Sequence, residues 1–127
     1  MIFAWPDGGG LRSFRATNGM LTAAGTNTER KPSHPAGIFT ISSNGAMPGT
    51  GVVWASIVDG GDAWHNVADG ALYAFDAADV AAPSLWNSLL APADDVGRFA
   101  KFSPPTVANG KVYLATFSGK LQVYGLK

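Results

Sequence analysis

Short apolar runs that alternate with glycine-rich turns dominate the sequence. Three segments share a glycine two places before a leucine and an aromatic residue three places after it, and they span residues 9–14, 70–75 and 119–124. Each follows a run rich in β-branched and aromatic residues, at 2–5, 52–57 and 112–117. Such runs between turn residues are typical of β-strands. Because the unit recurs, we expect a repeated sheet architecture.

Turn residues predict that these strands pair as hairpins. Asn44-Gly45 and Asn109-Gly110 each lie between apolar runs, and both residue types accept the positive φ angles of a type I′ turn. Ser118-Gly119 is expected to link the next pair of strands in the same manner. The Ala-rich residues 77–82 are too short for a helix and are closed by Pro83. The pattern therefore predicts an all-β fold.

Four antiparallel strands in a meander form one blade of a β-propeller. If the strands of a blade are labelled a to d from the central axis outward, residues 1–28 give an incomplete blade b-c-d. Residues 33–90 give a full blade, and residues 98–127 give an incomplete blade a-b-c. The predicted fold of residues 1–127 is thus a partial β-propeller of about two and a half four-stranded antiparallel blades.

An open ring of blades leaves unpaired backbone groups at its sheet edges, which are templates for joining another chain. We expect the further blades to come from a longer gene or from other copies of this chain. The start of the chain inside a b strand favours a fragment of a longer protein. An isolated chain of this kind is not expected to be a compact monomer.

Composition narrows the classes of partner. Hydrophobic residues make up 46% of the 127 residues, and nine basic side chains balance nine acidic ones. A balanced charge gives no field to hold nucleic acid or anionic lipid, and no apolar run approaches the ~20 residues of a membrane span. The chain has no cysteine, which excludes disulfides and thiolate metal sites. Its first residues lack the features of a signal peptide.

Several segments together resemble the quinoprotein (pyrroloquinoline quinone, PQQ) repeat propellers, and in particular the last blades of bacterial exported members. The resemblance covers most of residues 36–127 and is carried by residues 45–55, 61–63, 70–79, 85–88, 99–113 and 119–125. It implies a propeller whose parent protein is extracellular or periplasmic. It also implies that Trp86 packs between blades, although the turn before it, at 79–84, departs from the Thr-Gly of the family.

The resemblance leaves the function open, because one fold hosts many activities. Family members that are dehydrogenases hold the quinone and a calcium ion near the axis, but no position of this chain matches those ligands, so no cofactor is expected. The first hypothesis is a non-catalytic scaffold or binding module for protein or glycan. The alternatives are a fragment of a PQQ-dependent dehydrogenase and a lectin-like glycan-binding module.

The most promising binding residues lie in the long connection from about 59 to 69. In a propeller, the b-to-c and d-to-a connections share one face, and surplus loop length there often carries function. This loop offers two carboxylates, an indole, an imidazole and an amide, a set suited to a sugar or a cation: Asp59, Asp62, Trp64, His65 and Asn66. The structural alternative, given greater weight, is that the two aspartates cap turns, Trp64 packs on a neighbouring blade and Asn66 binds its own backbone.

The other chemistry-bearing residues favour structural interpretations. The spacing of Asp59 and Asp62 does not fit a calcium loop, so no metal site is predicted. His34 is expected to be a solvated loop residue, and the neighbouring Asp94 and Asp95 a solvated turn rather than a glycosidase pair. The cations on this face are expected to pair with loop carboxylates, and they are Arg30, Lys31, Arg98 and Lys101. Trp5 and Trp54 are expected to pack in the core.

Overall fold

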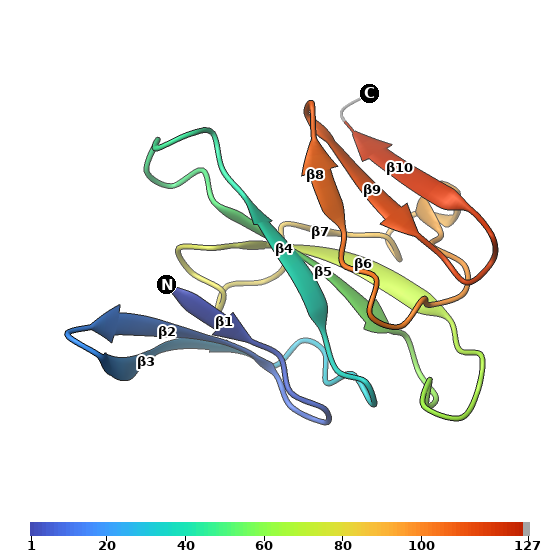
Figure 1. Cartoon of the computed structure of the whole chain (residues 1–127), viewed down its shortest axis with the longest axis horizontal. Coiled ribbons are helices and arrows are strands. Elements are labelled where there is room, and N and C mark those ends of the chain that lie inside the picture. The colour runs from blue at the N-terminus through green and yellow to red at the C-terminus, as the bar shows by residue number, and fades with distance from the viewer. Residues whose placement is uncertain (126–127) are drawn as a thin grey trace.

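The computed structural model describes residues 1–125 and contains three antiparallel β-sheets (Figure 1). Within those residues there is no α-helix, and a single 3-10 turn, η1, spans Pro92–Asp94. The first sheet comprises β1 (Ile2–Ala4), β2 (Leu11–Thr17) and β3 (Met20–Asn27). The central sheet comprises β4 (Ile38–Ser42), β5 (Val52–Val58), β6 (Gly70–Asp76) and β7 (Trp86–Asn87). The third sheet comprises β8 (Thr106–Ala108), β9 (Lys111–Ala115) and β10 (Leu121–Gly125).

The all-β prediction is confirmed, as are the division into three antiparallel sheets and the number of strands in each. Strands that follow one another in sequence are neighbours in every sheet, as in a meander. The boundaries differ in detail. Trp5, expected inside a strand, lies just beyond the end of β1.

Only one of the three predicted tight turns has the expected form. Asn109 and Gly110 both have positive φ, 51° and 70°, and join β8 directly to β9. The prediction for Asn44-Gly45 was wrong, because residues 43–51 form a longer loop in which the Thr50 hydroxyl accepts a hydrogen bond from the backbone N–H of Asn44 at 3.0 Å. Ser118-Gly119 was also wrong as a two-residue turn: residues 116–120 separate the strands, and only the glycine has positive φ.

Two hydrophobic cores hold the three sheets together. The core between the first and central sheets is built around Trp5, Leu11, Tyr73 and Phe75. The core between the central and third sheets is built around Leu72, Val112 and Leu114, with Trp54, Trp86 and Tyr124 packed against it. Strands β5 and β6 supply both cores with alternate residues. This explains why β6 is buried from Gly70 to Phe75.

Equivalent positions of the three sheets point in equivalent directions. The leucine of the repeated motif packs toward the next sheet, since Leu11 of β2 lies in the core shared with the central sheet, and Leu72 of β6 in the core shared with the third. The aromatic residue three places later packs toward the preceding sheet, as Phe75 and Tyr124 do. The sheets are therefore repeated units stacked in one direction.

The outer faces of the stack bear apolar side chains. In the third sheet, Leu121 takes the position of Leu72 but is 62% exposed, and the adjacent Val123 is 50% exposed. Register pairs Val123 with Tyr113, as it pairs Ala74 with Trp54 in the central sheet. The face that packs against a further sheet in the central unit is thus uncovered in the third.

No helix in residues 1–125 is long and apolar enough to cross a membrane.

Candidate functional site

Connections from all three sheets meet on one face, along the lower side of Figure 1. They interlock through backbone hydrogen bonds, including Gly8 N–H to Pro32 C=O (2.8 Å), Ala63 N–H to His34 C=O (3.3 Å) and Phe117 N–H to Arg98 C=O (2.9 Å). The Ser33 hydroxyl also donates to the Gly61 carbonyl. The loops therefore form one continuous surface, which we call the loop face, made of residues 5–10, 28–37, 59–69, 97–105 and 116–120.

Within the loop of residues 59–69, three of the predicted site residues lie together. The Asp62 carboxylate accepts a hydrogen bond from the Trp64 backbone N–H at 2.7 Å, which fixes a local turn. Its other oxygen lies 3.3 Å from Nδ1 of His65. The backbone hydrogen bond is the main reason that the pKa of Asp62 lies below its usual value, and the hydrogen bond with His65 contributes in the same direction. The carboxylate is therefore ionised at neutral pH.

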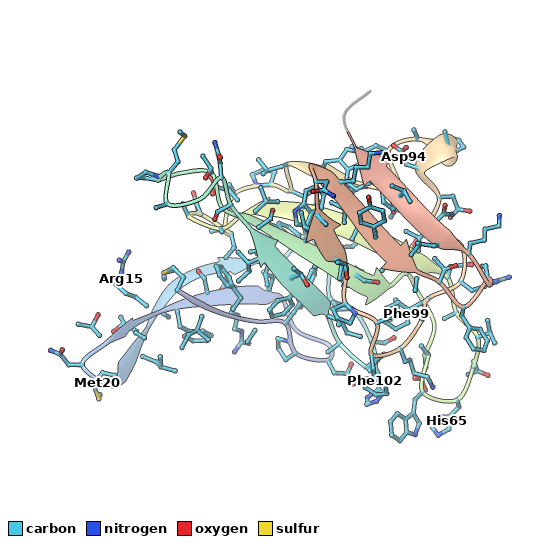
Figure 2. The ribbon with its side chains drawn as sticks, turned by 45° about the horizontal axis from the view of Figure 1, so that its top comes forward. Arg15, Met20, His65, Asp94, Phe99 and Phe102 are labelled. Carbon is cyan, nitrogen blue, oxygen red and sulfur yellow. The ribbon has the colours of Figure 1, made fainter. Side chains whose placement is uncertain are left out.

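Trp64 is 51% exposed and does not pack on a neighbouring sheet, contrary to the structural alternative. Its indole makes edge-on contacts with two imidazoles, with ring centroids 4.4 Å from His34 and 6.0 Å from His65. Its backbone carbonyl accepts a hydrogen bond from the Lys101 ammonium at 3.1 Å. Figure 2 shows His65 at the extremity of the molecule. Trp64 is thus an accessible aromatic surface in a fixed orientation.

The other two predicted site residues behave differently. Asp59 forms an ion pair with Arg30 at 2.9 Å, and Arg30 Nε donates to the hydroxyl of the buried Tyr73 at 2.5 Å. Asp59 therefore anchors residues 28–37. It is not part of the group formed by Asp62, Trp64, His65 and His34, which we call the Trp64 cluster. Asn66 is exposed, with no hydrogen bond from its side chain within residues 1–125.

Sequence reasoning missed the contributions from neighbouring loops. His34 was expected to be solvated, but it contacts Trp64, and its Nδ1 lies 3.4 Å from a carboxylate oxygen of Asp7. The predicted pairing of loop cations is confirmed for Arg30, with Asp59, and for Arg98, which lies 2.6 Å from Asp69. Among residues 1–125, no three His, Asp or Glu side chains gather as a metal site would require.

The Trp64 cluster carries groups that can contact a ligand. An exposed indole stacks on apolar faces of sugars or side chains, while the Asp62 carboxylate and the two imidazoles exchange hydrogen bonds with hydroxyl or amide groups. These side chains form a small polar surface with an aromatic residue, Trp64, at its centre.

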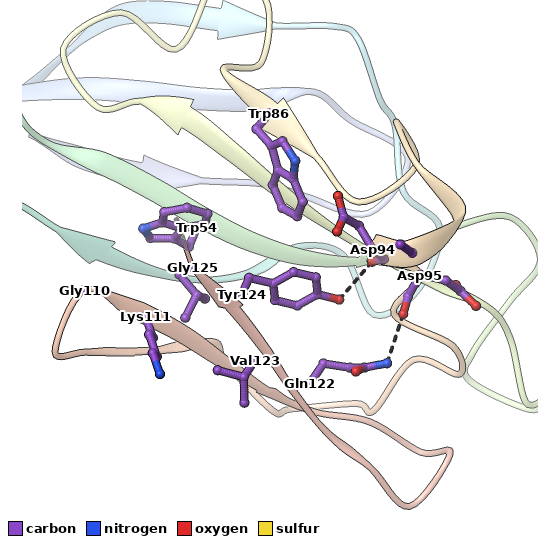
Figure 3. Close-up of a pocket in the computed structure, with 12 residues that line it drawn as sticks. Trp54, Trp86, Asp94, Asp95, Gly110, Lys111, Gln122, Val123, Tyr124 and Gly125 are labelled. Atoms are coloured by element: carbon purple, nitrogen blue, oxygen red, sulfur yellow. Dashed lines mark hydrogen bonds between the residues drawn. The ribbon is translucent and has the colours of Figure 1, made fainter. Parts of the chain in front are cut away.

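A concave feature with a volume of about 740 Å³ lies between the central and third sheets. Figure 3 shows its lining residues. Its wall includes Trp54, Trp86 and Tyr124, and its rim carries Asp94 and Asp95. We call it the aromatic pocket. Trp86 packs there between the two sheets, 5.4 Å from the ring of Tyr124, and Tyr124 donates a hydrogen bond to the Asp94 carbonyl at 3.1 Å.

Burial, followed by the nearby charges of Asp94 and Asp95, raises the pKa of Tyr124 to about 12. The ordinary value is 10.0, so the unfolded chain loses this proton first and stability falls between about pH 10 and 12. For a half-buried ring we expect the loss to be about 1 kcal/mol. Tyr124→Phe should remove that part of the loss, as measured by urea unfolding at pH 9 and pH 11. An equal decline with pH in both proteins would contradict it.

The chain matches no family model, no curated protein and no solved structure.

Proposed function

We propose that this chain contributes consecutive blades to a β-propeller of the quinoprotein-like repeat type and acts as a binding module. The blade order is that of the sequence: an incomplete unit from β1 to β3, a full unit from β4 to β7 and an incomplete unit from β8 to β10. The repeated direction of Leu11, Leu72 and Leu121 supports this reading, since each leucine takes the position that packs toward a following unit.

The partners proposed for this scaffold are further blades. The exposed Leu121 and Val123, beside Tyr113, offer the next unit an apolar surface. On the opposite side, Ile2 is 45% exposed and pairs with Phe14, which takes the position of Phe75 and would pack toward a preceding unit. Further blades come from the same longer polypeptide or from other copies of this chain, outside the cytoplasm in the parent protein.

The loop face is the proposed binding surface, and Trp64 is its centre. The observation that carries this part is the exposed indole held edge-on by His34 and His65, from two different connections. Accessible tryptophans are candidates for contact with a ligand, because an indole combines a large apolar face with one polar N–H group and is enriched among the residues that dominate binding energy. The mixture of indole, imidazole and carboxylate favours a glycan, with a protein segment as the alternative ligand.

A glycan array tests the proposal. Binding is expected for the parent chain, and Trp64→Ala should weaken it at least about tenfold, because one well-placed aromatic residue contributes more than about 1.4 kcal/mol to such contacts. Met47→Ala is the control, because Met47 is similarly exposed, at 58%, but lies in the loop of residues 43–51 at the other end of β5.

Each outcome of the array decides between readings. Binding that depends on Trp64 but not on Met47 supports the glycan site. Glycan binding that survives Trp64→Ala places recognition elsewhere and overturns this site. If no glycan binds, a peptide array is probed with the parent chain and the same two variants. Peptide binding that is unaffected by Trp64→Ala, or an absence of peptide binding, would contradict a binding site on the loop face.

A further inference from the structure

We infer that the aromatic pocket binds a quaternary ammonium group. The pocket is separate from the loop of residues 59–69, none of which line it. Its volume of about 740 Å³ falls within the range of small-molecule sites, about 300–1,000 Å³. The inference does not depend on the ligand proposed for Trp64.

Three aromatic rings from three strands form the wall of the pocket. Trp54 of β5 and Trp86 of β7 lie 6.5 Å apart with their planes tilted by 58°, and Tyr124 of β10 meets Trp86 at 60°. All three residues are half-buried, so part of each ring is accessible. The faces of aromatic rings carry negative potential and attract cations. Inclined rings present several such faces to one ligand.

The charge at the rim has the sign that a cation needs. Asp94 is half-buried, and within residues 1–125 its carboxylate takes part in no hydrogen bond or ion pair. Asp95 adds a second carboxylate, held by the Gly97 N–H at 3.0 Å. The only cationic side chain among the lining residues is Lys111, and Figure 3 shows its amine directed away from the tryptophan rings.

The state of the polar groups favours a quaternary ammonium over a sugar. A sugar needs several free donors and acceptors, but the Gln122 amide already donates to the Asp95 carbonyl at 3.0 Å and the Tyr124 hydroxyl to the Asp94 carbonyl. Trp54 Nε1 likewise donates to the Ser42 hydroxyl at 2.9 Å. A quaternary ammonium makes no hydrogen bonds, and it needs only ring faces and a nearby negative charge.

Choline and its neutral isostere 3,3-dimethylbutan-1-ol test the inference on the full chain. Both fill the same volume, but only choline is charged. We expect choline to change the intrinsic tryptophan fluorescence saturably, with the alcohol binding at least about tenfold more weakly. Asp94→Asn should weaken choline about 5–10-fold and leave the alcohol unchanged.

Asp76→Asn is the matched control, because Asp76 lies at the end of β6 and does not line the pocket, and asparagine retains the oxygen that accepts the Ala78 N–H. Its choline affinity should stay within about twofold of the parent. Equal affinities for choline and the alcohol would mean that the positive charge contributes nothing and that the site is only an apolar cavity. That result, a lack of saturable choline binding, or an unaffected Asp94→Asn variant would each overturn the inference.

Discussion

Replacing Phe75 by alanine is expected to lower the free energy of unfolding by about 3–5 kcal/mol, the range for truncation of an aromatic residue in a packed core. Phe75 is fully buried in β6. Its ring meets Trp5 edge-on at 5.5 Å and stacks on Tyr73 at 5.7 Å. The cavity would lie where the first and central sheets meet, so both sheets lose contacts. Urea unfolding followed by tryptophan fluorescence measures the change.

Phe102→Ala is the control for that experiment. Phe102 is 74% exposed, and Figure 2 shows it at the surface, so its truncation is expected to change stability by no more than about 0.5 kcal/mol. Equal losses from the two substitutions would mean that Phe75 is not part of a packed interface between sheets.

The double substitution Leu121→Lys and Val123→Lys is expected to weaken self-association of the chain at least about 100-fold. Both side chains lie on the outer face of the third sheet. In the proposed arrangement this face packs against another blade, where two unpaired ammonium groups would each carry a large desolvation cost. Sedimentation velocity over a concentration series measures the association constant.

Leu90→Lys controls for the general effect of charge on solubility. Leu90 is 69% exposed, similar to Leu121 at 62%, but lies in the connection after β7 rather than on the outer face. Its association should match that of the parent chain. If Leu90→Lys disrupts association as strongly as the double variant, or if neither variant has an effect, the outer face is not the contact surface.

Strand positions could be predicted because their signals are local. The spacing of glycine, leucine and aromatic residue fixes which side chains face each core, and the structure places Leu72 and Phe75 on opposite faces of β6 accordingly. Asn109-Gly110 forms the expected turn because the strands begin again immediately after it. Asn44-Gly45 does not, because Thr50 closes a longer loop through hydrogen bonds with residues several places away.

The candidate site was only partly predictable, since much of it is assembled from distant segments. Asp62, Trp64 and His65 lie together because they are neighbours in sequence, whereas His34 reaches Trp64 from another connection. The ion pair of Asp59 could not be predicted, because its partner, Arg30, is far away in the chain. The aromatic pocket had no sequence signature: Trp54 and Trp86 were expected to serve packing alone, and Asp94 to be solvated.

The repeated units explain why the chain is apolar on two opposite outer faces. Each sheet has one face toward the preceding unit and one toward the following unit, and only the central sheet has both faces covered within residues 1–125. Ile2 and Leu121 are exposed at opposite ends of this stack. The faces are therefore suited to contact each other between copies, head to tail.

Light scattering of the unmodified chain at micromolar concentration tests the stacked-blade account most directly. One chain has a mass of 13.1 kDa. With both outer faces uncovered, the account predicts particles of at least twice that mass, with the average rising with concentration. A compact species of 13.1 kDa that persists across the concentration range would contradict it.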